Sequence, residues 1–341
     1  MIQKMAFGVD LGWMTQLEDM GIRWVNEAGE ETDLLDAVIE KGADAVRLRV
    51  FVNPPEDAYW QKAEDTRCML GYCDPKSVLA AAKRVKEKNL RLMIDFHYSD
   101  HFADAQIQDI PEAWQKDSDD ELAAHVYEHT REVLKLLEQE GIRPEWVQVG
   151  NEINPGLLLP RGGLSENPQL MVRLLNSGYD AVKACLPDCQ VITHLAGVTS
   201  KTACDTFLET FFSLGGRTDI LGFSYYPYWD KLADSGEPAR FYNPLITYAE
   251  RFGKPVMVCE VGEDATEEKR SAEVVANTIE AVLQVPDHQG LGVFYWEPEV
   301  SADMLPDSYP LGAARLVAEN TLQLTDAISV YGTYRKARGK E

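Results

Sequence analysis

Eight short apolar runs, separated by helix-like segments, recur along the 341-residue chain and constrain its fold more than any other feature. Each run is rich in β-branched or aromatic residues and is largely apolar along its length, which is typical of strands buried on both faces of a parallel sheet. The expected strands span residues 6–10, 45–51, 91–97, 146–150, 190–197, 220–226, 255–262 and 292–298.

The segments between these runs carry helix signals, such as the Asp-Pro pair at 74–75 and a glycine that ends the pattern at residue 42. The expected helices span residues 31–42, 74–89, 118–141, 167–185, 202–215 and 265–284. Eight strands that alternate with helices predict an α/β fold, a closed (β/α)8 TIM barrel, as one catalytic domain over residues 1–341. A doubly wound open sheet is the alternative, but "GVDLGW" after the first strand is not a glycine-rich phosphate loop.

The charge balance of the chain is strongly acidic, with a formal net charge of −23 at pH 7. Such a field repels nucleic acid and anionic membrane surfaces, so we expect neither as a partner. No run of about 20 apolar residues is present to span a membrane, and "MIQKMAFGVDLGW" at the start has no apolar leader. We expect a cytoplasmic monomer, or a secreted one if a leader has been removed.

The cysteines do not follow the spacing of zinc ligands, because the two close pairs lack a matching Cys or His pair. Neither a metal nor a cofactor is expected. Cys259 lies inside an apolar run and is expected to be a small core residue. The six cysteines are Cys68, Cys73, Cys185, Cys189, Cys204 and Cys259.

Polar and aromatic side chains lie at the ends of most expected strands, although the rest of each strand is apolar. In a barrel the carboxyl ends of all strands open on one face, where active sites lie. Because isolated buried charges are unfavourable, this convergence indicates a functional site. The candidates are Arg49, His97, Asn151, Glu152, His194, Tyr225, Trp229, Glu260 and Trp296.

Several of these polar residues also have a structural interpretation, which the sequence leaves open. Arg47 or Arg49 can form an ion pair inside the barrel mouth, and the two histidines can be core residues with satisfied hydrogen bonds. Glu297 and Glu299 can be solvated loop charges.

Two glutamates, Glu152 and Glu260, directly end the fourth and seventh expected strands. Two carboxyl groups that face each other across a cleft are the basic apparatus of glycoside hydrolysis. One donates a proton to the leaving oxygen, and the other attacks the anomeric carbon. At about 5 Å separation, this pair gives a covalent intermediate and net retention of configuration.

The neighbours of the two glutamates indicate which of them is the nucleophile and which is the acid/base. A nucleophile is held as an anion by hydrogen-bond donors, here expected to be Arg49 and either Tyr225 or Tyr226. We therefore expect Glu260 to be the nucleophile and Glu152 the acid/base. Asn151 is expected to donate to the sugar 2-hydroxyl. Aromatic platforms for sugar rings are expected at Trp296, with Trp229 and Trp114 as further candidates.

Several stretches resemble family 53 of the glycoside hydrolases, which are endo-β-1,4-galactanases of the retaining clan A. The matching stretches are "GVDLGWMTQLE", "VRLRVFVNP", "GYCD", "LMIDFHYSDHFAD", "VQVGNEINPGLL", "DILGFSYYPYWD", "CEVG" and "GVFYWEPE". The resemblance covers residues 8 to about 299. It implies a (β/α)8 barrel with Glu152 as acid/base and Glu260 as nucleophile. It also implies that Arg49, His97, Asn151, Tyr225 and Trp296 surround the cleaved bond.

The chain departs from the family pattern at aromatic positions, with Phe51 and Phe102 where tryptophan is usual and Leu159 before Pro160. These changes alter the sugar platforms but leave the carboxyl pair intact. The expected partner is β-1,4-galactan or a galacto-oligosaccharide. The alternatives are the same machinery acting on another β-linked polysaccharide, such as a mannan or a glucan, or a catalytically silent sugar-binding barrel. Some family members bind calcium, for which the sequence offers no evident ligand cluster.

Overall fold

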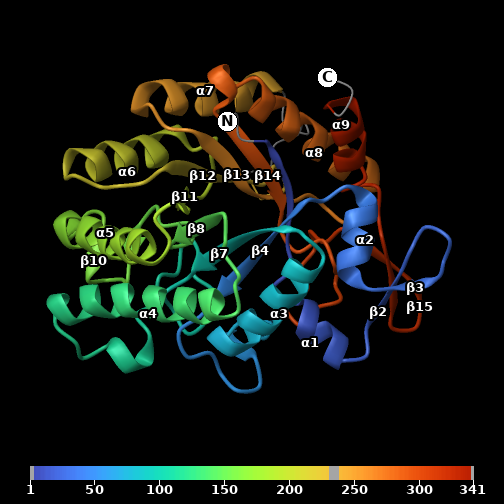
Figure 1. Cartoon of the computed structure of the whole chain (residues 1–341), viewed down its shortest axis with the longest axis horizontal. Coiled ribbons are helices and arrows are strands. Elements are labelled where there is room, and N and C mark those ends of the chain that lie inside the picture. Colours follow the sequence, from blue (N-terminus) through green and yellow to red (C-terminus); the bar gives the residue numbers. More distant parts are fainter. Residues whose placement is uncertain (1–3, 230–237, 339–341) are drawn as a thin grey trace.

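Eight parallel strands close into a barrel in the computed structural model, which describes residues 4–229 and 238–338. The order around the barrel is β1-β14-β13-β12-β11-β8-β7-β4 (Figure 1). Barrel strands that follow one another in the sequence are therefore adjacent in the barrel. This confirms the expected (β/α)8 barrel, whereas the extent of a single domain over 1–341 stays a prediction. The strands are β1 Ala6–Asp10, β4 Ala45–Val50, β7 Arg91–Phe96, β8 Trp146–Val149, β11 Gln190–Leu195, β12 Ile220–Tyr225, β13 Val256–Val261 and β14 Gly290–Tyr295.

Helices surround the barrel, and their ends follow local sequence signals. Asp74 accepts hydrogen bonds from the amides of Lys76 and Ser77 at the start of α3, and Ser118 with Glu121 forms a capping box at α4. The helices are α1 Met14–Asp19, α2 Leu34–Lys41, α3 Pro75–Glu87, α4 Asp119–Gln139, α5 Pro168–Cys185, α6 Lys201–Ser213, α7 Pro238–Phe252, α8 Glu268–Leu283 and α9 Val330–Arg338.

Helix α7 was not expected from the sequence, because it begins at Pro238 and contains Pro244. Proline inside a pattern is normally a sign that a helix ends or is interrupted. The remaining long helices agree with the expected ranges to within a few residues. Among the described residues, the structure has no helix with the length and apolar character needed to cross a bilayer.

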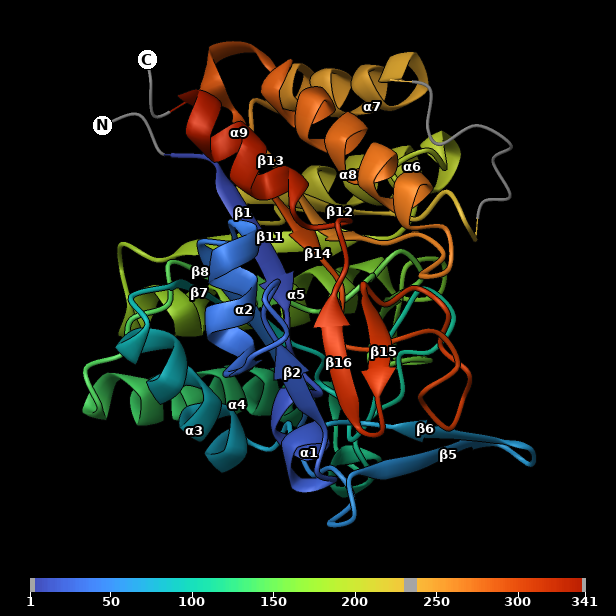
Figure 2. The ribbon, with the colours of Figure 1, turned by 90° about the vertical axis from the view of Figure 1, so that its right-hand side faces the viewer.

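Three small sheets decorate the barrel, and Figure 2 shows strands of two of them, β15 and β16 beside β2 and the β5–β6 pair. A four-stranded sheet joins the two halves of the chain in the order β15-β16-β2-β3, with β16 parallel to β2. A hairpin formed by β5 and β6 projects from the barrel after β4. The bounds are β2 Arg23–Val25, β3 Glu31–Thr32, β5 Tyr59–Ala63, β6 Thr66–Met69, β9 Gly156–Leu157, β10 Gly162–Gly163, β15 Ala314–Ala318 and β16 Thr321–Leu324.

The barrel interior has an apolar layer below a polar one. The apolar layer fills the lower part of the barrel and consists of Ala6, Ala45, Met93, Trp146, Ile192, Ile220, Met257, Cys259, Leu291 and Phe294. Strand side chains alternate, so residues two positions further on point into the same interior, nearer the carboxyl end. Arg47, Asp95, Gln148 and His194 therefore form a buried polar layer directly beneath the barrel mouth.

Candidate active site

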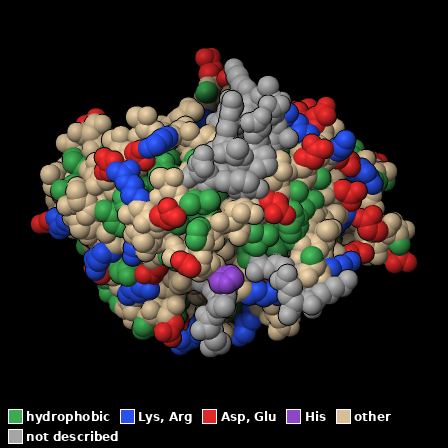
Figure 3. Space-filling view, turned by 90° about the horizontal axis from the view of Figure 1, so that it is seen from above, with side chains coloured by type: hydrophobic (Ala, Val, Ile, Leu, Met, Phe, Trp, Pro, Cys, Tyr) green, Lys and Arg blue, Asp and Glu red, His purple; other side chains and the backbone are tan. Residues whose placement is uncertain are grey.

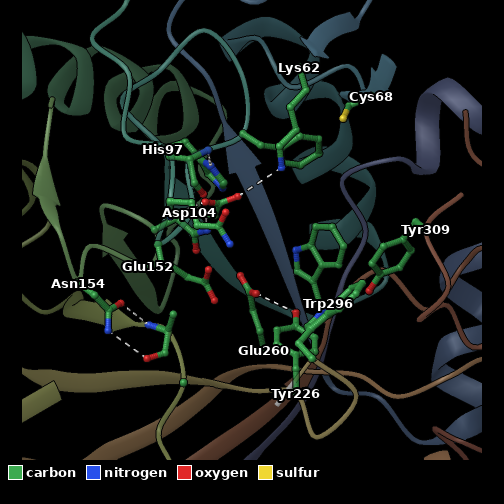
Figure 4. A pocket seen from close by; sticks show the side chains of 18 of the residues that line it. Lys62, Cys68, His97, Asp104, Glu152, Asn154, Tyr226, Glu260, Trp296 and Tyr309 are labelled. Carbon is green, nitrogen blue, oxygen red and sulfur yellow. Dashed lines mark hydrogen bonds and ion pairs between the residues drawn. The ribbon is translucent and has the colours of Figure 1, made fainter. Parts of the chain in front are cut away.

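A cavity of about 750 Å³ opens at the carboxyl ends of the strands (Figure 4). Six of the nine residues that the sequence proposed for the site line this cavity, which we call the cleft. These six are His97, Asn151, Glu152, Trp229, Glu260 and Trp296. Arg49, His194 and Tyr225 are buried outside its lining, and each is treated below.

The carboxyl groups of Glu152 and Glu260 point toward one another across the cleft (Figure 4). Glu152 follows β8 and has a φ of 49°, in the left-handed region that non-glycine residues seldom adopt. Such backbone strain is concentrated at functional sites, where the surrounding structure holds it in place. The strand end is therefore shaped to present this side chain to the cleft.

Glu260 reaches the cleft because β13 contains a bulge. Phe223 of β12 is paired with Val258, while the next residue, Ser224, is paired with Glu260. Cys259 is the extra residue, and a bulge lets two successive side chains point to the same side of a sheet. Cys259 accordingly belongs to the interior apolar layer, as expected, and the adjacent Glu260 lines the cleft.

Two donors hold the Glu260 carboxyl group. The Arg47 Nη2 atom lies 3.0 Å from Oε1, and the Tyr226 hydroxyl donates to Oε2 at 2.8 Å. Burial raises the pKa of Glu260 to about 7, while Arg47 and Tyr226 oppose that rise. Both contacts favour the ionised form, which is the form that a nucleophile needs.

The expectation that Arg49 holds Glu260 was wrong, because Arg47 does so, and of the two tyrosines that the sequence left open Tyr226 is the donor. Arg49 forms ion pairs with Asp10, at 3.2 Å, and with Glu297, and its guanidinium lies 4.8 Å from the ring centre of Phe102. Arg47 and Arg49 point to the same side of β4, and the residue nearer the barrel centre is Arg47.

Tyr226, and not Tyr225, donates to Glu260 because side chains alternate along β12. Side chains alternate along a strand, so Ser224 and Tyr226 face the interior and the cleft while Tyr225 faces the surrounding helices. Tyr225 is 2% exposed and belongs to the main apolar core between barrel and helices.

Glu152 lies in less favourable surroundings for a negative charge. Desolvation in the cleft, followed by the proximity of Glu260, raises the pKa of Glu152 to about 8. The Ser224 hydroxyl and the Ala105 amide oppose this rise only in part. Between these two pKa values the arrangement favours a protonated Glu152 facing an ionised Glu260.

Asn151 is oriented by three hydrogen bonds to its side-chain oxygen. The donors are Arg47 at 2.9 Å, Gln148 at 3.0 Å and His194 Nδ1 at 2.8 Å. The Asn151 amide nitrogen donates one hydrogen to the Ala103 carbonyl at 2.9 Å. Its second amide hydrogen is left to face the cleft, which Asn151 lines.

His194 orients Asn151 from outside the cleft lining. Burial, and then Arg47, lower its pKa well below the usual range, so the imidazole is neutral. Its Nδ1 donates to Asn151, and its Nε2 accepts from the Ser224 hydroxyl at 2.9 Å. The structure thus combines the two interpretations of His194, because it is a satisfied core histidine that positions a cleft residue.

His97 lines the cleft with a fixed ring orientation. Its Nε2 lies 2.9 Å from Asp95, and its Nδ1 accepts from the Ala103 amide at 2.9 Å. Burial disfavours a charged Asp95, but Arg47 and then His97 outweigh it and lower the pKa of that carboxyl. His97 is therefore joined through Asp95 to the same arginine that contacts Glu260.

Aromatic side chains form one wall of the cleft. Trp296 packs against Trp13 at 5.2 Å and against Tyr309 at 5.0 Å between ring centres. Trp229 lies at the cleft edge and is 53% exposed. Trp114 is not part of the cleft lining, because it is buried and stacks on His125.

Glu297 and Glu299 are fully buried, so the interpretation as solvated loop charges was wrong. Glu297 accepts from the amides of Gly12 and Trp13 and pairs with Arg49. Burial raises the pKa of Glu297 to about 8 and that of Glu299 to about 7, and the negative charge of Glu299 adds to the rise at Glu297.

Several cleft residues were missed by the sequence analysis. Trp60 and Lys62 come from the β5–β6 hairpin, Asp104 from the loop after β7, and Tyr309 from the segment after β14. Their positions depend on loop conformation, which strand periodicity does not encode. Across residues 4–229 and 238–338, no group of three or more His, Cys, Asp or Glu side chains is placed to hold a metal ion.

A closed (β/α)8 barrel with two facing carboxyl groups at its carboxyl end is the architecture of a glycoside hydrolase. Residues 6–331 match the family described as glycosyl hydrolase family 53, and the chain belongs to that family.

Named relatives agree with this classification. The chain is 30% identical to a probable arabinogalactan endo-β-1,4-galactanase A of Aspergillus terreus, over 95% of this chain and 94% of the relative. It is 31% identical to an arabinogalactan endo-β-1,4-galactanase of Cellvibrio japonicus, over 85% and 79%. A solved fungal β-1,4-galactanase superposes with a TM-score of 0.80 at 25% identity, covering 95% of this chain and 98% of that structure.

Proposed function

We propose that the protein is a retaining, endo-acting glycoside hydrolase that cleaves β-1,4-galactan or galacto-oligosaccharides. The observation that carries the proposal is the pair of facing carboxyl groups with unequal surroundings. Glu260 receives an arginine and a tyrosine hydroxyl, whereas Glu152 lies in a desolvated position without a cationic partner among its described contacts.

In the first step, the ionised Glu260 attacks the anomeric carbon as the glycosidic C–O bond breaks. Glu152 gives its proton to the departing sugar oxygen, which leaves a glycosyl–Glu260 ester. In the second step, Glu152 takes a proton from water, which attacks the same carbon and releases Glu260. The free Asn151 amide hydrogen is placed to bind the 2-hydroxyl, whose hydrogen bond strengthens in the transition state.

The choice of galactan rests on the relatives, two of which are named as arabinogalactan endo-β-1,4-galactanases. A cleft lined by tryptophan rings, carboxylates and amides suits a neutral, hydroxylated chain. The intact carboxyl pair argues against a catalytically silent sugar-binding barrel.

The decisive experiment measures reducing-sugar release from β-1,4-galactan by the wild type and by Glu260→Gln. We expect clear hydrolysis by the wild type and a loss of several orders of magnitude in the variant. Nuclear magnetic resonance of the first product is expected to show the β-anomer, because the configuration is retained. Equal activity in Glu260→Gln, or a first product in the α-configuration, contradicts the mechanism.

A β-linked mannan or glucan remains the second candidate, because Phe51 and Phe102 stand at positions where the family pattern has tryptophan. Both rings lie close to the site, since Phe102 lines the cleft and packs on Phe51 at 5.6 Å. The same assay with β-1,4-mannan and β-glucan separates the candidates. Faster cleavage of either of them replaces galactan as the substrate and leaves the chemistry unchanged.

A further inference from the structure

The β5–β6 hairpin forms a wall at the end of the cleft where Lys62 and Cys68 lie (Figure 4). Its base is tied to the buried site, because the Trp13 indole donates to the Met69 carbonyl at 2.7 Å and Arg49 donates to the Leu70 carbonyl at 3.0 Å. Short antiparallel pairing from Tyr59 to Met69 continues this anchor outward. The hairpin is therefore fixed relative to the site.

Trp60 of the hairpin lines the cleft, and one face of its ring is covered. His101 covers this face and stacks on it with 3.8 Å between ring centres and 5° between planes. His101 does not line the cleft but a neighbouring cavity, together with Asp109. The imidazole therefore covers one face of the indole from the side of that second cavity, and Trp60 meets the cleft with a part of its ring that His101 leaves uncovered.

The imidazole beneath Trp60 is itself held in place. Its Nδ1 lies 2.9 Å from the carbonyl oxygen of Phe102, and its Nε2 lies 3.3 Å from Asp109. An aromatic ring that is fixed in this way is a preorganised platform for the apolar C–H face of a sugar ring.

Polar groups beside Trp60 can bind hydroxyls. Lys62 lies 3.8 Å from Asp104 Oδ2, beyond hydrogen-bond distance, so the ammonium hydrogens remain available to a ligand. The Asp104 side chain is fixed by the amides of Gln106 and Ile107, which donate to its Oδ1 atom at 2.7 and 3.0 Å. Asp307 also lines this region. One ammonium among carboxylates suits a neutral hydroxylated ring better than an anionic one.

We propose that the β5–β6 hairpin builds a sugar-binding subsite, separate from the cleaved linkage, in which Trp60 is the platform and Lys62 and Asp104 bind hydroxyls. The ligand is one neutral hexose unit of a longer β-linked chain. The subsite makes the enzyme prefer substrates long enough to reach the hairpin. This inference rests on the proposed glycoside hydrolase activity and extends it to chain-length preference.

The test compares kcat/KM for galacto-oligosaccharides of increasing length in the wild type, Trp60→Ala, Trp60→Phe and the control Gln61→Ala. Gln61 neighbours Trp60 but is absent from the cleft lining, because successive strand residues face opposite sides. In the wild type, kcat/KM is expected to rise when the oligomer first reaches the hairpin. Trp60→Ala is expected to lose about tenfold on those longer substrates and nothing on the shortest one, as an aromatic contact of this kind predicts. Trp60→Phe is expected to recover part of the loss, and Gln61→Ala to match the wild type.

An equal loss on every chain length overturns the subsite, because it shows that Trp60 only supports the fold. Full activity of Trp60→Ala on long oligomers also overturns it. The same series is run with β-1,4-linked mannose and glucose oligomers, so that cleavage of one of these changes the substrate class while still testing Trp60. A wild type that cleaves none of the three series contradicts the proposed function and the subsite together.

Discussion

The guanidinium of Arg47 lies 3.0 Å from the Glu260 carboxyl group, and the Arg47 side chain is fully buried. The same guanidinium lies 2.7 Å from Asp10 and 2.8 Å from Asp95. A buried charge network of this kind is stable only when its members are paired and hydrogen-bonded. Arg47 therefore fixes the position of Glu260 and favours its charge at once.

Replacing Tyr226 with phenylalanine removes the hydroxyl that donates to Glu260 at 2.8 Å. Hydrogen bonds to charged groups contribute about 1.5–3 kcal/mol, so kcat/KM is expected to fall about ten- to a hundredfold. The acidic limb of the pH profile is expected to move to higher pH, because Tyr226 lowers the pKa of Glu260. Steady-state kinetics across pH measure both effects.

Tyr225→Phe is the matched control for Tyr226→Phe, since the two substitutions affect adjacent residues and each removes a phenolic hydroxyl group. Tyr225 faces the apolar core, so its variant is expected to keep the wild-type pH profile. A shifted acidic limb in Tyr225→Phe, with none in Tyr226→Phe, would reverse the assignment.

The pH dependence of kcat/KM is expected to be bell-shaped. Below the pKa of Glu260, raised to about 7, this group is protonated and cannot attack. Above the pKa of Glu152, raised to about 8, that group is ionised and cannot donate a proton. The basic limb is therefore expected near pH 8, in contrast to an ordinary glutamate with a pKa of about 4.3.

Glu152→Ala tests the basic limb directly. On a dinitrophenyl glycoside, whose leaving group needs no proton, the variant is expected to form the glycosyl ester without that limb. Azide is expected to restore turnover and to give a β-glycosyl azide, since it replaces water as the nucleophile that attacks the anomeric carbon of the glycosyl ester. If the basic limb of the pH profile persists in Glu152→Ala, that limb reports the ionisation of another group.

Asn151→Ala tests the role of the free amide hydrogen. Contacts to the 2-hydroxyl supply several kcal/mol in the transition state, so kcat/KM is expected to fall about a hundredfold or more. With a 2-deoxy glycoside the difference between variant and wild type is expected to disappear. Asn154→Ala is the control, because Asn154 also lines the cleft but bonds Ala196. An Asn151→Ala loss that is unchanged on the 2-deoxy substrate contradicts this role.

Glu299→Gln is expected to change how stability depends on pH. Burial raises the pKa of Glu299 from 4.5 to about 7, so the folded state holds a proton that the unfolded state releases. That contribution is fully present below pH 4.5 and is lost as pH rises through about 7. The neutral glutamine escapes this loss. At pH 8 the variant is expected to gain up to about 3 kcal/mol relative to its difference at pH 4.

Denaturant unfolding at pH 4, 6 and 8 measures the difference between Glu299→Gln and the wild type. Glu132→Gln, at an exposed position on α4, is the control and is expected to show no such trend. A difference that stays constant across pH would show that Glu299 is not protonated in the folded state.

The barrel and the carboxyl pair could be predicted because both follow from patterns along single strands. Continuous apolar runs fix which segments are strands, and a charged residue at a strand end is conspicuous against them. Glu152 and Glu260 needed only this reasoning. The absence of a nucleic-acid partner stays a prediction from the net charge of −23. Figure 3 shows Lys and Arg side chains scattered among acidic ones on the coloured part of one face of the molecule.

The choice between neighbours could not be predicted in the same way. Tyr225 and Tyr226 differ only in which side of β12 they face, and the bulge at Cys259 changes the alternation on the adjacent strand. Arg47 and Arg49 share one face, so their depth in the barrel decides which meets Glu260. Strand β5 is exposed over its last three residues, β6 begins with two polar residues, and α7 contains a proline, so neither the hairpin nor the helix carried a recognisable signal.

The sheet that joins β16 to β2 has a consequence for how the protein is made. Strand β2 begins at Arg23, yet its partner begins at Thr321, and the Tyr331 hydroxyl donates to the Gly8 carbonyl of β1. During translation β2 is synthesised first and stays unpaired on this side until β16, near the carboxyl end of the chain, has been synthesised. A nascent chain that ends before residue 321 thus exposes an unpaired edge of β2, a kind of surface that is prone to aggregate.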